Sequence, residues 1–263
     1  MTTNDTPRGP EKDDLNTRLK NDWTAAALNA EKAPEVPRGL MSFASDGRGR
    51  PTNEQKYLHL SAVTFTYAVW EPYAEDVAIE LVNILAPLLP SDSIPPQVTD
   101  ALSGKDAWQL AVHPGWRGLW ADEVNKAAKG GKGADYGINT ASYKNVQGLF
   151  ELAGIGDALP SHLSVAPGGR LGNLKRAPAN VGVTKSKTVN VNRCLSLLIS
   201  VRGQAVHTAR TEDKLLKNEV LWWTAFIREL HEEVDRRARG AVMRLLASAI
   251  DVEPAPVLAR DSS

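Results

Sequence analysis

Cysteine is almost absent from this chain of 263 residues, which contains Cys194 and no other. A single thiol excludes an intrachain disulfide, and it also excludes a zinc site built on cysteine pairs. The sequence has no run of 18 apolar residues, the length expected of a membrane-spanning helix. Its first residues lack the apolar core of a signal peptide. We therefore expect a cytoplasmic protein.

Acidic residues are absent from residue 158 to residue 211, although the whole chain balances 31 Lys and Arg against 31 Asp and Glu. The basic residues of this acid-free stretch are Arg170, Lys175, Arg176, Lys185, Lys187, Arg193, Arg202 and Arg210. A local excess of positive charge favours binding to a phosphate backbone. The candidates for RNA contacts are Lys185, Lys187, Arg193 and Arg210. The alternative is an ordinary solvated surface.

Metal-ligand spacing is absent as well, because no His-x3-His or His-Glu-x2-His sequence occurs. The glycine-rich segments at 129–133 and 167–169 do not match a P-loop, since neither leads through Gly-Lys-Ser or Gly-Lys-Thr into an apolar helix. Glu71, Glu75 and Asp76 form an acidic patch, but acidic residues on helices more often pair with Arg or face solvent. We expect neither a metal ion nor a cofactor.

Helical periodicity is what the sequence has in abundance. After a capping position at Thr52 or Asn53, apolar residues recur three and four apart and predict a helix about 30 residues long. Pro72 predicts a kink in this helix, and Pro87 marks its end. The apolar seam consists of Leu60, Val63, Tyr67, Trp70, Ala74, Val77, Leu81 and Ile84.

Two further strong helices are predicted in the C-terminal half, from about residue 188 and from about residue 212. The first carries Val191, Leu195, Leu198 and Val201; the second carries Leu216, Val220, Trp223, Ile227, Leu230 and Val234 and extends towards Leu245. Shorter helices are expected at 15–27, 108–112, 116–124 and 145–153, with a connector at 32–53 and a mobile basic loop at 129–133. Strand-type alternation is lacking, so we predict an all-α fold, a helical bundle with irregular insertions.

The chain divides by composition into three parts. Residues 1–52 are predicted to form a polar, partly disordered extension with a short helix, 53–245 the helical domain, and 246–263 a C-terminal tail. Trp222 and Trp223 are adjacent on the last strong helix. Trp223 continues the apolar seam and is predicted to lie in the core, whereas Trp222 is a candidate for a subunit interface.

Three segments occur in an order that resembles the HEPN superfamily of small helical bundles, in particular its RiboL-PSP branch. They are Ala-Val-Trp-Glu-Pro-Tyr-Ala-Glu-Asp-Val at 68–77, Tyr-Lys-Asn-Val-Gln-Gly-Leu-Phe-Glu-Leu-Ala-Gly-Ile at 143–155, and Val-Asn-Arg-Cys-Leu-Ser-Leu-Leu-Ile-Ser-Val-Arg-Gly-Gln-Ala-Val-His at 191–207. The last segment ends in the Arg-x4-His element and is followed by a further amphipathic helix. The resemblance covers roughly residues 53–240.

The resemblance implies a homodimeric, metal-independent endoribonuclease in which the Arg and His of both subunits converge at the dimer seam. These residues are Arg202 and His207. The family usually has a small polar residue directly after the Arg, whereas this chain has Gly203, and the polar Gln204 is displaced by one position. A branch with Tyr two residues after the His is disfavoured, because that position is Ala209.

The chemistry of RNA cleavage fits this pair of residues. RNA supplies its own nucleophile, the 2′-hydroxyl, so an enzyme need only arrange groups around the phosphate. Histidine ordinarily exchanges protons near neutrality, and arginine presents a planar, permanently charged fork. We hypothesise that Arg202 stabilises the phosphate, that His207 handles the proton, and that Glu71 orients Arg202. The product would carry a 2′,3′-cyclic phosphate.

Two other interpretations stay open at the level of sequence. Arg202 is also compatible with a surface ion pair, and His207 with a residue that merely ends its helix. On the functional side, Gly203 is compatible with a non-catalytic dimer that binds RNA or a partner protein. If the chain is a toxin or a phage-defence effector, its partners are RNA, a second copy of itself, and an antitoxin or defence-system protein.

Overall fold

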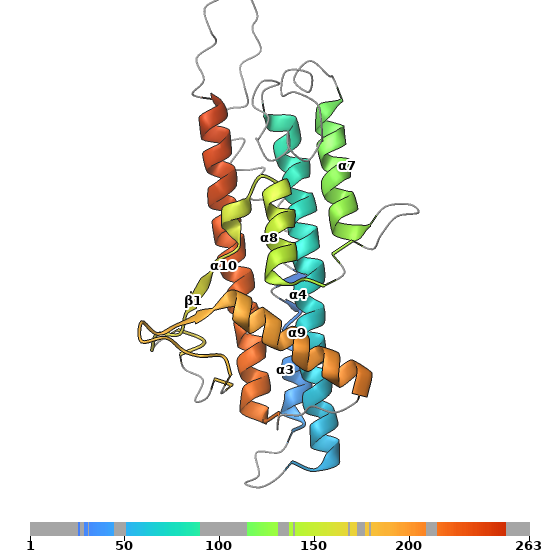
Figure 1. The fold of residues 1–263 in the computed structure, drawn as a ribbon, viewed down its shortest axis with the longest axis vertical. Helices are drawn as coiled ribbons and strands as arrows, with labels where there is room; N and C mark the ends of the chain where they lie inside the picture. The colour runs from blue at the N-terminus through green and yellow to red at the C-terminus, as the bar shows by residue number, and fades with distance from the viewer. Residues whose placement is uncertain are drawn as a thin grey trace, which may run out of the picture.

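The computed structural model shows a mainly helical protein (Figure 1). It describes residues 26, 29–30, 32–44, 51–89, 115–130, 137–138, 140–167, 169–172, 177–178, 180–208 and 215–250. Their helices are α3 (Glu35–Ser42), α4 (Asn53–Leu88), α7 (Trp116–Lys129), α8 (Tyr143–Leu152), the 3-10 turn η1 (Gly156–Ala158), α9 (Val191–Thr208) and α10 (Lys217–Ile250). The strands β1 (His162–Ser164) and β2 (Thr188–Asn190) form one small antiparallel sheet. The predicted all-α fold is confirmed.

The long helices α4 and α10 form the centre of the molecule and run in the same direction (Figure 1). The Thr66 and Thr224 hydroxyls lie 3.1 Å apart, and the Tyr73 hydroxyl donates to the His231 carbonyl at 3.0 Å. Both pairs are 158 residues apart in the chain. Equal separations of this kind require parallel helices that keep one register over two turns.

The sequence of α4 explains both its start and its core face. Thr52 forms a capping box with Gln55, which satisfies backbone donors at the first turn. Pro72 and Pro87 both lie inside the helix, which continues past each of them to Leu88. Most of the predicted seam is buried; its first and last members, Leu60 and Ile84, are half-buried.

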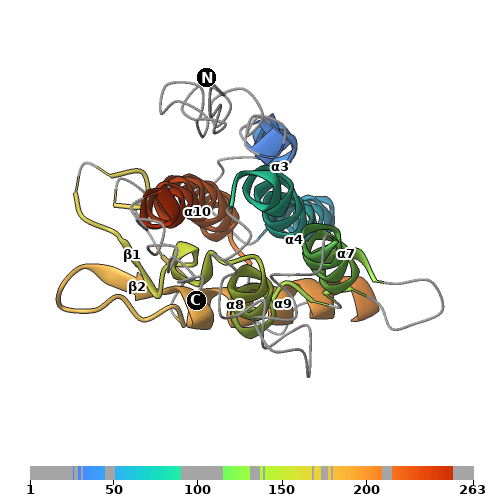
Figure 2. The same ribbon diagram turned by 90° about the horizontal axis from the view of Figure 1, so that it is seen from above.

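The remaining helices cover the α4–α10 pair from two sides (Figure 2). Helix α3 lies on one side, and α8 and α9 lie on the other, with α9 crossing α4 steeply in Figure 1. Helix α7 runs antiparallel to α4: the Arg117 guanidinium donates to the Leu89 carbonyl at 2.6 Å, while Lys129 at the other end reaches Glu75. Helix α9, in turn, packs on α4 and on α8.

The prediction of a connector at 32–53 is wrong for Glu35–Ser42, which form helix α3. Pro34 precedes this helix and Pro37 lies in its first turn, where the missing N–H costs nothing because first-turn donors have no intrahelical partner. Met41 is buried in the shared core. The Lys217 ammonium donates to the Ala44 carbonyl at 2.6 Å. The boundary at residue 52 stays a prediction, but the described residues before it pack on α4 and α10.

The C-terminal helices differ from the predictions mainly at their ends. Residues 188–190 pair with 162–164 as strands, so α9 begins at Val191. Helix α10 begins at Lys217. The Glu219 carboxylate in its first turn accepts from the N–H of the preceding Leu216 at 2.9 Å. It continues to Ile250, beyond the predicted end at 245. The helices expected at 15–27 and 108–112 fall almost entirely outside the described residues.

Trp222 does not contribute to an exposed subunit interface, and that prediction is wrong. Its ring is buried within the chain, stacks on Phe226 with ring centroids 5.6 Å apart, and meets Trp223 edge-on at 5.1 Å. Trp223 is buried in the core, as predicted. Among the described helices, none has the length and apolar character needed to cross a membrane.

Candidate functional site

Helix α9 carries the two principal candidate residues, and its N-terminal half is anchored firmly. The Asn190 side chain caps it by accepting from the Arg193 N–H at 2.9 Å. Val191, Cys194 and Leu198 are buried beneath it. Burial raises the pKa of the Cys194 thiol to about 12, so the thiol stays protonated and is no nucleophile near neutrality.

Arg202 is held against α4 by an aromatic ring. Its guanidinium carbon lies 5.4 Å from the centre of the Tyr67 ring, a distance at which a cation is attracted to the ring face. The Tyr67 hydroxyl accepts from the Ala141 N–H at 2.8 Å and points towards the Glu71 carboxylate at 3.5 Å. Burial raises the pKa of Tyr67 to about 12, so the hydroxyl stays neutral. The ring is therefore a fixed platform for Arg202.

Glu71 lies beside Tyr67 in the same group of residues, and its role in orienting Arg202 stays a prediction. Burial raises the pKa of its carboxyl, and the neighbouring charge of Glu75 raises it further. The Ala141 backbone, the Arg202 charge and the Tyr67 hydroxyl oppose this increase. Glu71 and Arg202 thus interact electrostatically, and the half-buried acid compensates part of the guanidinium charge.

His207 lies on the last turn of α9 and is exposed. Five residues of helix separate it from Arg202, which corresponds to about 7.5 Å along the axis and about 140° around it. Since Arg202 faces Tyr67 on α4, His207 points to a different side of α9. The two predicted residues share one helix end but do not form a single cluster within one chain.

The residues between them are placed differently. A side chain at Gly203 would meet nothing within 4 Å of its Cβ, so the position next to Arg202 is open. Gln204 is half-buried.

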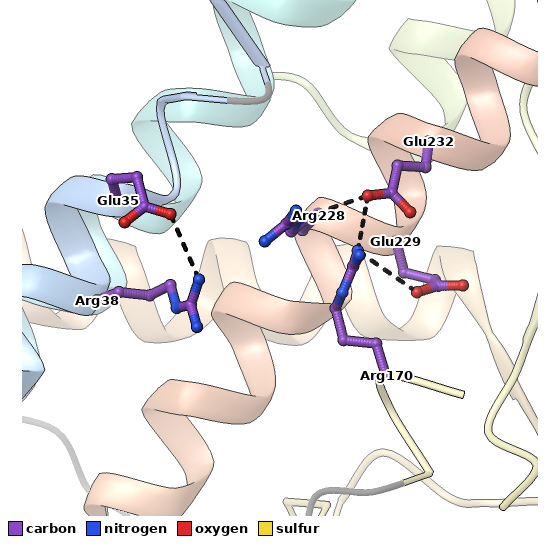
Figure 3. Close-up of polar contacts among 6 residues, drawn as sticks. All are labelled: Glu35, Arg38, Arg170, Arg228, Glu229 and Glu232. Atoms are coloured by element: carbon purple, nitrogen blue, oxygen red, sulfur yellow. Dashed lines mark hydrogen bonds and ion pairs between the residues drawn. The ribbon is translucent and has the colours of Figure 1, made fainter. Parts of the chain in front are cut away.

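Part of the charge of the acid-free stretch is used to hold its own loop. The Arg193 guanidinium donates to the Asn180 carbonyl at 2.7 Å. Arg170 pairs with Glu232 at 2.8 Å and with Glu229 at 3.7 Å on α10, and Arg228 shares the Glu232 carboxylate (Figure 3). These contacts give Arg170 and Arg193 structural roles, which an acid-free sequence pattern does not reveal.

The other predicted basic residues fall into two groups. Lys185 and Lys187 are exposed on the turn that leads into β2, where they face solvent. Arg210 lies outside the described residues, as do Lys175 and Arg176.

The acidic patch on α4 is largely occupied by a lysine. The Lys129 ammonium lies 2.6 Å from the Glu75 carboxylate and 2.9 Å from that of Asp76. Lys129 is the last residue of α7, and its ion pairs fix this end of the helix to α4. It is also the first residue of the segment predicted to be a mobile loop. In the described part of the chain, no group of three or more His, Cys, Asp or Glu side chains is placed to hold a metal ion.

His231 is buried in the core, although the residues that follow it in the sequence, Glu232 and Glu233, are charged. Its ring is buried, stacked on Trp70 at 5.7 Å and tilted against Tyr73 at 4.2 Å between ring centroids. Within the part of the chain that the structure describes, neither ring nitrogen has a hydrogen bond of ordinary geometry. Burial lowers the pKa of His231 to about 3, and the nearby Ala30 backbone opposes this only partly. By contrast, His59 bonds to the Leu215 carbonyl at 2.8 Å, and His162 is exposed on β1.

Two surface features near these helices were not predicted from the sequence. A shallow apolar groove of about 270 Å³ lies between α4 and the end of α9, lined by Tyr57, Leu60, Ser61, Thr64, Phe65 and Ala205. A larger cleft lies between α8 and α10, where several arginines gather. The arginine spacing on α10 is visible in the sequence, but the opposing walls come from residues about 80 positions away.

Comparison with known proteins adds no relative. No protein-family model, no curated protein and no solved structure matches this chain.

Proposed function

We propose that this protein is a metal-independent endoribonuclease of the HEPN type that cleaves RNA through Arg202 and His207 at a dimer seam. The observation that carries the proposal is the setting of Arg202, whose guanidinium rests on the Tyr67 ring beside the half-buried Glu71, with an exposed histidine on the same helix end. A cytoplasmic toxin or phage-defence effector is the role that fits such an activity.

Each residue has a definite task in this proposal. Arg202 stabilises the charge that builds up on the phosphate oxygens, for which a pre-positioned fork is more effective than a mobile one. His207 takes the proton of the 2′-hydroxyl or returns a proton to the leaving 5′-oxygen. Glu71 and Tyr67 position Arg202 without touching the substrate. The bond from phosphorus to the 5′-oxygen breaks as the bond to the 2′-oxygen forms, which leaves a 2′,3′-cyclic phosphate.

Apolar exposure at the end of α9 supports a site shared between two subunits. Tyr57 is 58% exposed, Phe65 48% and Val206 52%, and the first two line the groove that ends at Ala205. Large apolar side chains that gather on one face commonly mark an interface. A two-fold axis through this face would bring both copies of Arg202 and His207 together, which the 140° between them prevents within one chain.

A cleavage assay in EDTA tests the proposal directly. Purified protein is incubated with total RNA, and the ends of the fragments are analysed for 2′,3′-cyclic phosphate. We expect cleavage by the wild type and its loss in His207→Ala. His162→Ala is the matched control, because it removes an exposed histidine from β1 instead. Intact RNA with the wild type, or equal cleavage by His207→Ala, would refute the nuclease.

One observation favours a second candidate, a non-catalytic HEPN dimer that binds RNA or a partner protein. Gly203 leaves an open space where the family usually has a polar side chain. Binding that weakens steeply with salt, without any cleavage, would support this candidate, because phosphate contacts release counterions. Lys185 and Lys187 are the exposed residues expected to contribute to that salt dependence.

A further inference from the structure

A second candidate binding site lies away from α9, in the cleft between α8, η1 and α10. Its volume is about 600 Å³, which falls in the range of roughly 300–1,000 Å³ typical of small-molecule and cofactor sites. Its lining includes Tyr143, Gln147, Arg236, Arg237, Gly240 and Arg244. None of them belongs to the Arg202 site.

Three arginines make one wall of the cleft cationic. Arg236 forms two hydrogen bonds with the Glu233 carboxylate, at 2.9 and 2.7 Å, and Arg237 forms one at 2.6 Å. The Arg236 hydrogen bonds hold the pKa of Glu233 below its ordinary value, so this acid stays charged. One carboxylate between two guanidinium groups leaves a net positive charge and fixes the two groups beside the cleft.

Arg244 adds a third guanidinium with little compensation. Among the described residues, it forms an ion pair with Asp157 at 4.0 Å, and both side chains are mostly exposed, at 66% and 92%. An ion pair that long and that exposed contributes little. Arg244 is therefore available to a ligand in a way that Arg170, which is paired twice to α10, is not.

Gly240 opens the floor between Arg236 and Arg244. The three residues are spaced four apart and so follow one side of α10 over about 12 Å. A glycine inside a helix costs about 1 kcal/mol relative to alanine, so its presence calls for a local reason. A Cβ at this position would lie 3.4 Å from the Arg244 guanidinium, so a methyl group would be tolerated, whereas a longer side chain would extend into the cleft that Gly240 lines.

The opposite wall is mixed in character and is held in place by a side-chain amide. It is lined by Tyr143 and Leu159 together with the polar residues Gln147, Asp157 and Ser161. Gln147 donates to the Gly156 carbonyl and to the Glu151 carboxylate, each at 2.9 Å, which ties η1 to α8. The cleft thus combines guanidinium forks on one side with the Tyr143 ring, set among polar side chains, on the other. Phosphates fit the first wall and a nucleobase fits the second.

We propose that this cleft binds a free nucleotide, with its phosphates on Arg236, Arg237 and Arg244 and its base towards Tyr143. The bounded size of the cleft favours a single nucleotide over an extended strand. The proposal does not depend on RNA cleavage by Arg202 and His207, so either can fail without the other.

Calorimetric titration of the full chain tests the proposal, with ATP, adenosine, pyrophosphate and a short RNA oligonucleotide as the four probes. We expect ATP to bind and adenosine to bind much more weakly. Arg236→Ala and Arg244→Ala should each weaken ATP binding about tenfold, because each loses a charge-assisted contact. Both side chains are largely exposed, at 70% and 66%, so both variants should fold. Gly240→Leu should block binding by filling the floor.

Arg38→Ala is the matched control for these variants. Arg38 is also an exposed arginine with an acidic partner three residues away, Glu35 at 3.3 Å, but it lies on α3 (Figure 3). Its removal should leave ATP binding unchanged. The proposal is overturned if ATP does not bind, if Arg38→Ala weakens binding as much as Arg244→Ala, or if pyrophosphate binds as well as ATP. Tighter binding of the oligonucleotide, lost in the same two variants, would overturn it in favour of an RNA-contacting surface.

Discussion

His207 and His231 are the same residue type in opposite surroundings. His207 lies exposed at the end of α9, whereas His231 is buried between α4 and α10, with its ring against Trp70 and Tyr73. Burial lowers the pKa of His231 to about 3, so this ring is neutral at physiological pH and has no access to a substrate. Of these two histidines, only His207 is accessible for the proton exchange that the proposed function requires.

Aromatic rings have opposite effects on the charge of the side chain beside them at His231 and at Arg202. At His231 the aromatic rings exclude water and suppress the charge. At the Arg202 site one aromatic face, that of Tyr67, supports a permanent charge instead. The first arrangement contributes to the stability of the α4–α10 pair, and in the proposed function the second prepares a cation for the substrate. The following predictions separate these two roles.

The largest effect is expected at Arg202 and His207. Arg202→Ala and His207→Ala should each lower the rate of RNA cleavage by about 10²–10⁴-fold, the range typical of a lost proton-transfer or oxyanion-stabilising group. Arg202→Lys should retain part of the activity, because it keeps the charge and loses the planar fork. Single-turnover cleavage of a labelled RNA measures these rates. A rate in Arg202→Ala equal to that of the wild type would remove Arg202 from the mechanism.

His231 should make the folded state sensitive to acid without affecting cleavage. Its pKa is about 3 in the folded chain and about 6.5 when unfolded, so the unfolded state binds more protons below pH 6.5. Stability is therefore fully present above about pH 6.5 and is lost as the pH falls towards 3, by about 1.4 kcal/mol per unit.

His231→Phe should flatten this pH dependence, because it keeps an aromatic ring and loses no hydrogen bond. Urea denaturation between pH 4 and pH 7 measures the effect, with His162→Phe as the exposed control. If His231→Phe keeps the slope of the wild type, the acid sensitivity has another source.

Tyr67 allows its ring and its hydroxyl to be tested separately. Tyr67→Phe keeps the ring under Arg202 but leaves the buried Ala141 N–H without its acceptor, which should cost about 1–3 kcal/mol in the free energy of unfolding. Under conditions in which Tyr67→Phe is fully folded, its rate of RNA cleavage should change little. Tyr67→Leu removes the ring as well and should lower kcat several-fold with little change in KM. Equal kcat values for the two variants would show that the ring does not position Arg202.

Gly203 offers the smallest and most specific change. Gly203→Ala should stabilise α9 by about 0.5–1 kcal/mol, because a Cβ there meets nothing within 4 Å and glycine is a poor helix former. Gly203→Asn places a polar side chain beside Arg202 and should raise the cleavage rate above that of Gly203→Ala. Thermal unfolding and the cleavage assay measure the two effects. If Gly203→Asn cleaves no faster than Gly203→Ala, the missing polar neighbour does not limit activity.

The sequence predicted those parts of the fold that depend on local spacing. The seams of α4 and α10 recur every three or four residues, so they identify the helices and most of their buried residues. His231 follows the same spacing from Thr224 and Ile227, but its acidic neighbours Glu232 and Glu233 obscured that signal. Its burial depends on the parallel register with α4, which local spacing does not determine.

The candidate site was only partly predictable for the same reason. Arg202, His207 and Glu71 follow from the resemblance and from chemistry, but the contact of Arg202 with Tyr67 arises because α9 crosses α4 at that point. The internal contacts of Arg170 and Arg193 depend on loop placement in the same way. The arginine cleft needs α8 and η1 opposite α10, a juxtaposition of distant segments.

The central claim, a site shared across a two-fold axis at the end of α9, is tested most directly by cross-linking at Val206. Val206→Cys is treated with a short bismaleimide, and Val36→Cys on α3 serves as a control of nearly equal exposure. The native Cys194 is buried, with a pKa raised to about 12, and should not react. We predict a covalent dimer with Val206→Cys and none with Val36→Cys. A monomer in light scattering, together with no excess of cross-linked Val206→Cys, would contradict the shared site.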